Sequence, residues 1–145
     1  MMKQLKQNSL VKISIGIIYL WFGTLKFFPE LSPAEGLATE TIRELTFGII
    51  PASISIILLA LLEVGIGICF LLNIQPKKVA VVAVAHLVCT FAPLFFFKAI
   101  SFNGYPVFLT LVGQYIMKNL IIIAALLSIL NEKEKQLESI EVIEK

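Results

Sequence analysis

Four long apolar stretches dominate the chain, at about residues 11–28, 50–72, 79–99 and 107–130. A helix needs about 20 mostly apolar residues to cross the hydrocarbon core of a membrane. The first stretch is the weakest, because Lys12 opens it and Lys26 lies near its end, from where a long side chain can reach the interface. The pattern predicts an all-α membrane protein with four spanning helices in contact with the lipid bilayer.

A different pattern separates the first two stretches. Ser32, Pro33 and Glu35 read as a capping box with proline at the first helical position. Over residues 34–45 apolar side chains then recur on one helical face, and charged side chains take the other face. These features predict a short amphipathic helix on the membrane surface, over about residues 33–46. We interpret it either as a lid over the bundle or as a surface for gating or docking a partner.

The later connections are short, which favours an up-down four-helix bundle. Asn103 and Gly104 mark a turn between the third and fourth stretches. The tail, residues 131–145, mixes glutamate and lysine with leucine and isoleucine. It reads either as an amphipathic extension of the last helix or as a solvated end. Residues 1–145 are therefore interpreted as one integral membrane domain.

Composition and charge agree with a membrane location. The chain is 58% hydrophobic, compared with about 45–50% in soluble domains, and its mean hydropathy is +0.91. The lysines divide unequally between the two sides, which predicts cytoplasmic termini. Eight fall on the cytoplasmic side: Lys3, Lys6, Lys12, Lys77, Lys78, Lys133, Lys135 and Lys145. The net charge of +2 follows from this topology, and no basic cluster with interleaved aromatics indicates nucleic-acid binding.

A signal peptide is the alternative interpretation of the first stretch, since Lys3 and Lys6 precede an apolar run. No small-residue cleavage pattern follows Phe28. Trp21 and Lys26 instead resemble the anchored end of a spanning helix.

Three ionisable residues lie singly inside the later stretches: Glu63, His86 and Lys118. A charge inside a membrane costs roughly 2.5–3.5 kcal/mol on insertion scales, so it needs a partner or a function. With a helical rise of about 1.5 Å per residue, all three fall about 17–20 Å below the outer surface. The sequence therefore predicts a polar cluster near the midplane of the bundle.

Helical facing extends this cluster, because each stretch carries one polar or small stripe that should face inward. The candidate supporting residues on these stripes are Tyr19, Lys26, Gln114, Tyr115 and Asn119. Two interpretations stay open. Glu63 and Lys118 form a buried ion pair that fixes helix register, or the cluster handles protons or a ligand.

The sequence lacks the residues that several kinds of metal, redox and catalytic site require. There is no Cys-x-x-Cys, and Cys69 and Cys89 differ in depth by about 14 Å, which disfavours a disulfide. One histidine per chain excludes two-histidine haem ligation within a monomer, leaving only His86 with Met117 as a formal axial pair. Without aspartate and with one histidine, a zinc site lacks ligands. The sequence indicates no metal, no nucleotide-binding loop and no catalytic residue set.

Aromatic residues gather toward the outer ends of the stretches. They read as an interfacial belt or, in part, as the lining of a pocket for a flat apolar ligand such as a quinone. Pro93 would kink the third helix beside Cys89 and Thr90 and make room for such a ligand.

Four segments of the chain carry a resemblance to a known family. They are Trp21-Phe22-Gly23-Thr24-Leu25-Lys26-Phe27, Glu63 with Gly65 and Gly67, Thr90-Phe91-Ala92-Pro93, and Gly113-Gln114-Tyr115-Ile116-Met117-Lys118-Asn119. These segments resemble the DoxX-like small membrane proteins. The resemblance covers roughly residues 11–130. It implies a four-span protein of the bacterial inner membrane. Some relatives are described as subunits of quinone-linked sulfur oxidation or of oxidative-stress complexes, and the family provides no catalytic roles to carry over.

Two hypotheses follow. In the first, the chain is a non-catalytic component of a membrane complex that handles protons or a small solute. In the second, it is a quinone-interacting subunit of an oxidoreductase with membrane or soluble redox partners, in which His86 and Lys118 donate to a quinone oxygen and Glu63 relays protons. The sequence specifies neither a substrate nor an oligomeric state.

Overall fold

The computed structural model describes residues 2–28, 31–32, 35–104 and 107–131, with side chains from residue 9 onward. Its regular structure is helical, as the sequence predicts. The elements are α1 (Met2–Leu25), α2 (Glu35–Leu45), α3 (Ala52–Leu71), α4 (Pro76–Cys89), α5 (Pro93–Phe96), α6 (Lys98–Ser101) and α7 (Leu111–Leu130). Three segments are long and apolar enough to cross a membrane: Ala52–Leu71, Pro76–Phe96 and Leu111–Leu130. These segments indicate a membrane protein.

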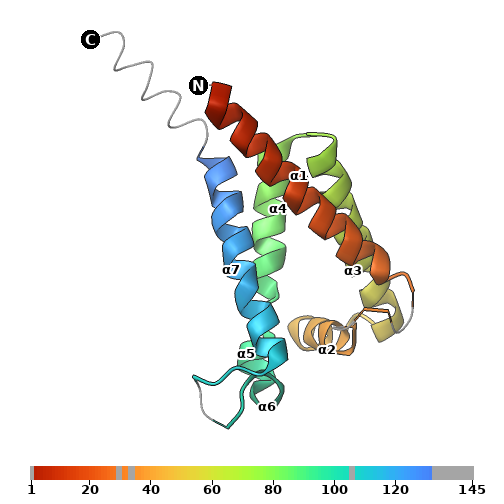
Figure 1. The fold of residues 1–145 in the computed structure, drawn as a ribbon. Helices are drawn as coiled ribbons and strands as arrows, with labels where there is room; N and C mark the ends of the chain where they lie inside the picture. The colour runs from red at the N-terminus through yellow and green to blue at the C-terminus, as the bar shows by residue number, and fades with distance from the viewer. Residues whose placement is uncertain (1, 29–30, 33–34, 105–106, 132–145) are drawn as a thin grey trace.

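The four long helices run alternately in opposite directions (Figure 1). α1 packs along α3, and α4 packs along α7. The α3–α4 turn lies near the start of α1 and the end of α7, an end of the molecule called here the α3–α4 end. The opposite end, called the α2 end, carries α2, α5 and α6, and α2 packs against α3 and α5. The two helix pairs diverge toward the α2 end.

Glycine allows α1 and α3 to approach until their backbones touch. A Cβ added to Gly67 would lie 2.6 Å from the backbone nitrogen of Leu20, and one on Gly23 would lie 2.8 Å from that of Val64. A Cβ on Gly65 would meet nothing within 4 Å. The inward stripes predicted for the first two stretches therefore meet through Gly67 and Gly23, whereas Gly65 is not a packing glycine. Small residues at such contacts favour close helix association in membranes.

The hydrophobic core occupies the half of the molecule toward the α3–α4 end. It joins residues from α1, α3, α4 and α7: Ile15, Tyr19, Ile66, Phe70, Ala80, Ala83, Leu87, Leu126 and Ile129. Many large apolar side chains on the long helices are instead exposed. Such an apolar exterior is the surface that a lipid bilayer would cover.

Local chemistry explains where the helix ends differ from the apolar stretches. α4 begins at Pro76, because proline suits the first helical position and the lysines after it continue the turn. α7 begins only at Leu111, because the Thr110 side chain accepts from the Gly113 N–H at 3.2 Å and caps the helix. α1 begins at Met2, well before the apolar part, and ends at Leu25.

The third apolar stretch is interrupted, as Pro93 led us to expect. α4 ends at Cys89 and α5 begins at Pro93, with turn-type hydrogen bonds between them. The Asn103–Gly104 turn is also present, with Gly104 at φ +76°. The amphipathic helix predicted over residues 33–46 is observed as α2, Glu35–Leu45, with Thr41 buried. Pro33 and Ala34 of its predicted cap lie outside the described residues, as does the tail from residue 132.

Candidate polar site between α1, α3 and α4

Glu63 is paired with Lys26 rather than with Lys118. The Lys26 Nζ donates to Glu63 Oε2 at 2.5 Å, and the two side chains are only 8% and 10% exposed. Lys26 is the first residue after α1, and its ammonium also lies 3.4 Å from the Phe22 carbonyl oxygen. A cation at the C-terminal end of a helix interacts favourably with the carbonyls there. The pair therefore satisfies both the Glu63 carboxylate and the end of α1.

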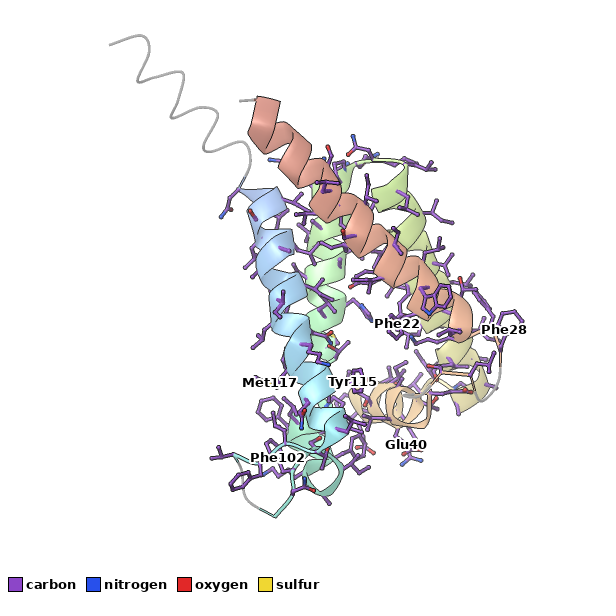
Figure 2. The ribbon with its side chains drawn as sticks, viewed as in Figure 1. Phe22, Phe28, Glu40, Phe102, Tyr115 and Met117 are labelled. Carbon is purple, nitrogen blue, oxygen red and sulfur yellow. The ribbon has the colours of Figure 1, made fainter. Side chains whose placement is uncertain are left out.

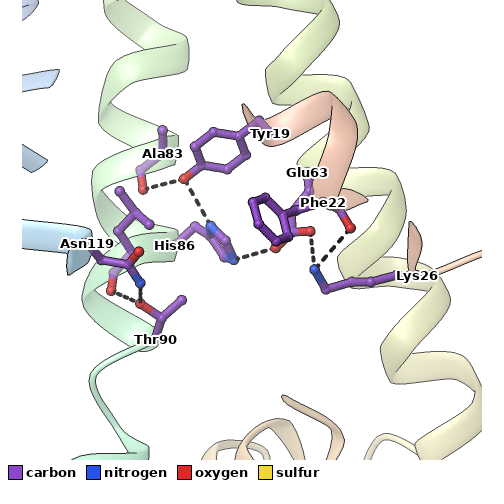
Figure 3. A network of polar contacts seen from close by, with 9 residues as sticks. Tyr19, Phe22, Lys26, Glu63, Ala83, His86, Thr90 and Asn119 are labelled. Atoms are coloured by element: carbon purple, nitrogen blue, oxygen red, sulfur yellow. Dashed lines mark hydrogen bonds and ion pairs between the residues drawn. The ribbon is translucent and has the colours of Figure 1, made fainter. Parts of the chain in front are cut away.

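His86 extends this ion pair to α4. Its Nε2 lies 3.5 Å from Glu63 Oε1, and its Nδ1 lies 3.1 Å from the Tyr19 hydroxyl (Figure 3). The same hydroxyl lies 3.3 Å from the Ala83 carbonyl oxygen. Lys26, Glu63, His86 and Tyr19 thus form a continuous polar chain, called here the buried network. It joins α1, α3 and α4 beside the hydrophobic core, of which Tyr19 is also a member.

A second polar contact ties α7 to α4. The Asn119 side-chain amide donates to Thr90 Oγ1 at 2.8 Å, and Thr90 donates in turn to the Leu87 carbonyl at 2.6 Å (Figure 3). Thr90 is the C-cap residue of α4 and lies one helical turn beyond His86, so the end of α4 makes polar contacts at two successive turns. Asn119 is the predicted supporting residue of α7 that contacts this cap.

Lys118 does not join the buried network in the structure. It is exposed on α7, and its ammonium lies 4.7 Å from the centre of the Tyr115 ring. Tyr115 itself is 58% exposed. Gln114 is also exposed and donates to the Leu109 carbonyl at 3.3 Å. Of the three midplane residues predicted from the sequence, the structure brings together Glu63 and His86, with Tyr19 and Lys26 as their partners.

The sequence did contain a signal for the role of Lys26. It shares a helical face with Gly16, Tyr19 and Gly23, and this face packs on α3. Lys26 was expected to extend to the membrane surface because it lies near the end of an apolar stretch. In the structure that end lies against the middle of α3, where Gly23 approaches Glu63 and Val64. The ammonium is therefore buried at the site instead of reaching the interface.

The hydrogen bonds of the buried network can be arranged in two ways. In one, Tyr19 donates to His86 Nδ1, and the Nε2–H faces the Glu63 carboxylate. In the other, Tyr19 donates to the Ala83 carbonyl, and a His86 Nδ1–H donates to the Tyr19 oxygen. In this second arrangement a neutral His86 has no hydrogen on Nε2, so the carboxyl opposite must carry one. Alternatively His86 is cationic and donates at both nitrogens. The geometry therefore accommodates one added proton without moving a helix.

Among the described residues, no group of three or more histidine, cysteine, aspartate or glutamate side chains is arranged to hold a metal ion. Cys69 and Cys89 are free thiols. Comparison with models of protein families, with curated proteins and with solved structures finds no match for this chain.

Proposed function

We propose that the chain is a non-catalytic component of a membrane complex that handles protons through the buried network. The observation that carries this proposal is the Lys26–Glu63–His86–Tyr19 chain, held among apolar helices. Ionisable groups at such a depth are expensive to place in a membrane and usually mark a pathway or a relay. Histidine suits this role, because one imidazole nitrogen can accept a proton while the other releases one.

The proposal includes a four-span topology in which α1 is the fourth spanning helix. The apolar part of α1, Ser9–Leu25, is shorter than the other three candidates. At about 1.5 Å per residue it covers roughly 25 Å, close to the ~30 Å hydrocarbon core. A modest mismatch of this size is met by local thinning of the bilayer or by flanking side chains that extend to the interface. The tight contact of α1 with α3 supports its position inside the bundle.

The proposed location is the inner membrane of a bacterium. In the proposed orientation, the α3–α4 end faces the cytoplasm. Lys12 and Lys77 lie at this end and make polar contacts there. Lys12 donates to the Asn73 side chain at 3.1 Å, and Lys77 donates to the Leu130 carbonyl at 3.2 Å. Lysine-rich ends face the cytoplasm in most membrane proteins. This topology agrees with the resemblance to DoxX-like proteins, which remains part of the proposal.

The quinone hypothesis receives no specific support from the geometry. It required His86 and Lys118 to donate to one quinone oxygen. Both ring nitrogens of His86 instead face protein groups, and Lys118 lies over Tyr115. Stoichiometric quinone in the purified protein, lost on Lys118→Leu, would replace our proposal with this alternative.

The proton-handling role is tested by the single histidine of the chain. In protein labelled with ¹⁵N-histidine and reconstituted in lipid, solid-state NMR reports the protonation of each ring nitrogen of His86 separately. We expect the pattern to change with pH in the wild type, and the change to be lost in Glu63→Gln. Tyr19→Phe should alter the Nδ1 signal selectively. A histidine spectrum that is identical in wild type and Glu63→Gln at every pH would refute proton handling by the network.

A further inference from the structure

Lys118 is a charged residue that the fold leaves at the surface of an apolar helix. It lies seven residues after the start of α7, or about 10 Å along the helix. Its ammonium rests over the Tyr115 ring, at 4.7 Å from the ring centre. A cation–π contact stabilises the charge but does not neutralise it. A lysine at this depth in a spanning helix normally faces the protein interior or a partner.

The described part of the chain provides no carboxylate within ion-pair distance of Lys118. Glu63 lies within the apolar helices, and it is buried against Lys26. Glu40 and Glu44 lie on α2, and both are within ion-pair distance of Arg43. No ion-pair partner of Lys118 is therefore found among the described residues.

Lys118 belongs to an uncovered stripe along the length of α7, called here the Lys118 stripe. Its residues are Leu111, Gln114, Lys118, Ile121 and Ser128, at spacings of three, four, three and seven. All five are exposed, Leu111 by 70% and Ile121 by 73%. Ala125, between Ile121 and Ser128, packs against the hydrophobic core and is not part of the stripe. In Figure 2, Tyr115 and Met117 leave α7 on different sides, and they are 58% and 38% exposed. Spacings of three and four are typical of a helix that packs along a second helix.

A second copy of this chain is a poor occupant of the stripe. Two copies with the same orientation in a membrane are related by a two-fold axis along the membrane normal, and a shared stripe meets itself at the same depth. Lys118 would then face Lys118. Like charges in an environment of low dielectric repel strongly.

We propose that the Lys118 stripe docks a spanning helix of a different membrane protein, which places an aspartate or glutamate at the depth of Lys118. The charge of Lys118 selects a carboxylate, and Gln114 adds a side-chain amide that can hydrogen-bond across the contact. Ser128 allows close approach at the other end of the stripe. This inference rests on the proposed role as a component of a complex, and it names the chemistry of the partner.

The test uses a synthetic spanning helix of leucine and alanine that carries one glutamate about 10 Å from its outer end. Matched helices carry glutamine or leucine at that position. Association with the full chain is measured by fluorescence energy transfer in phosphatidylcholine vesicles. We expect the glutamate helix to bind at least roughly tenfold more tightly than the leucine helix, with the glutamine helix between them. The preference for glutamate should disappear in Lys118→Leu and persist in Lys98→Leu, which removes an exposed lysine from α6.

A second pair of variants tests the stripe without changing a charge. Ser128→Phe places a bulky side chain on the stripe, whereas Leu127→Phe places it on a different exposed side of α7. Only Ser128→Phe should weaken binding of the glutamate helix. Three results would each overturn the inference. They are equal binding of the glutamate and leucine helices, equal effects of the two phenylalanine variants, and self-association of the chain that depends on Lys118. Because Lys118 lies outside the buried network, the His86 spectrum of Lys118→Leu should match the wild type, so the two proposals can fail separately.

Discussion

The ion pair between Lys26 and Glu63 leads to a quantitative prediction about stability. Glu63→Gln keeps the shape of the side chain but leaves the Lys26 ammonium without a counter-charge. Because both side chains are about nine-tenths buried, water cannot replace the lost partner. Breaking a buried pair on one side costs about 3–5 kcal/mol. That loss is roughly two to four powers of ten in the unfolding equilibrium.

The double change Lys26→Met with Glu63→Gln removes both charges and should recover most of this loss. Apolar or neutral replacements of a complete buried pair are often close to neutral in stability. Unfolding is followed by circular dichroism during titration of mixed micelles with sodium dodecyl sulfate. Lys118→Met serves as the control and should leave the effect of Glu63→Gln unchanged. If the double variant is as unstable as the two single variants combined, the two residues do not interact and the reasoning fails.

Three further predictions concern packing and topology. Gly67→Ala should destabilise the protein by about 1–3 kcal/mol, because the added Cβ would meet the Leu20 backbone. Gly65→Ala adds a Cβ that meets nothing within 4 Å, so it should leave the stability unchanged. Equal losses of stability in the two variants, measured by unfolding in micelles, would contradict the packing. Asn119→Leu should lower the free energy of unfolding by about 0.6 kcal/mol, and at most about 1.7 kcal/mol, because it removes the hydrogen bond to Thr90. A stability at or above that of the wild type in the same assay would argue against this contact. In intact cells, Asn103→Cys should react with membrane-impermeant thiol reagents, with Cys69→Ala and Cys89→Ala in the background; labelling only after the cytoplasm is opened would reverse the proposed orientation.

The pattern of the sequence predicted most of the elements and part of the site. Apolar stretches and turn residues predicted the long helices, the amphipathic helix α2 and the Asn103–Gly104 turn, but not the separate short helices α5 and α6. Depth counting placed Glu63 and His86 at one level, and they lie 3.5 Å apart across α3 and α4. This worked because both helices are long, and their depths could be counted from well-marked ends.

The partner of Glu63 could not be found by the same counting. Depth was estimated as though every helix began and ended at the membrane surface, which placed Lys118 at the level of Glu63 and Lys26 near the outer side. The offset of α1 against α3 is instead set by the backbone contact at Gly67 and Gly23. That contact brings the end of α1 opposite the middle of α3. A sequence shows that such glycines are present, but it does not show which turn of the neighbouring helix each one meets.

The most direct test of the account is a measurement of which lysine lies beside Glu63 in a bilayer. In protein labelled with ¹³C-glutamate and ¹⁵N-lysine, rotational-echo solid-state NMR detects a carboxyl carbon and an ammonium nitrogen in contact. We predict a short-range coupling that disappears in Lys26→Met and in Glu63→Gln, and that persists in Lys118→Met. A coupling to Glu63 that survives Lys26→Met and disappears in Lys118→Met would contradict the account.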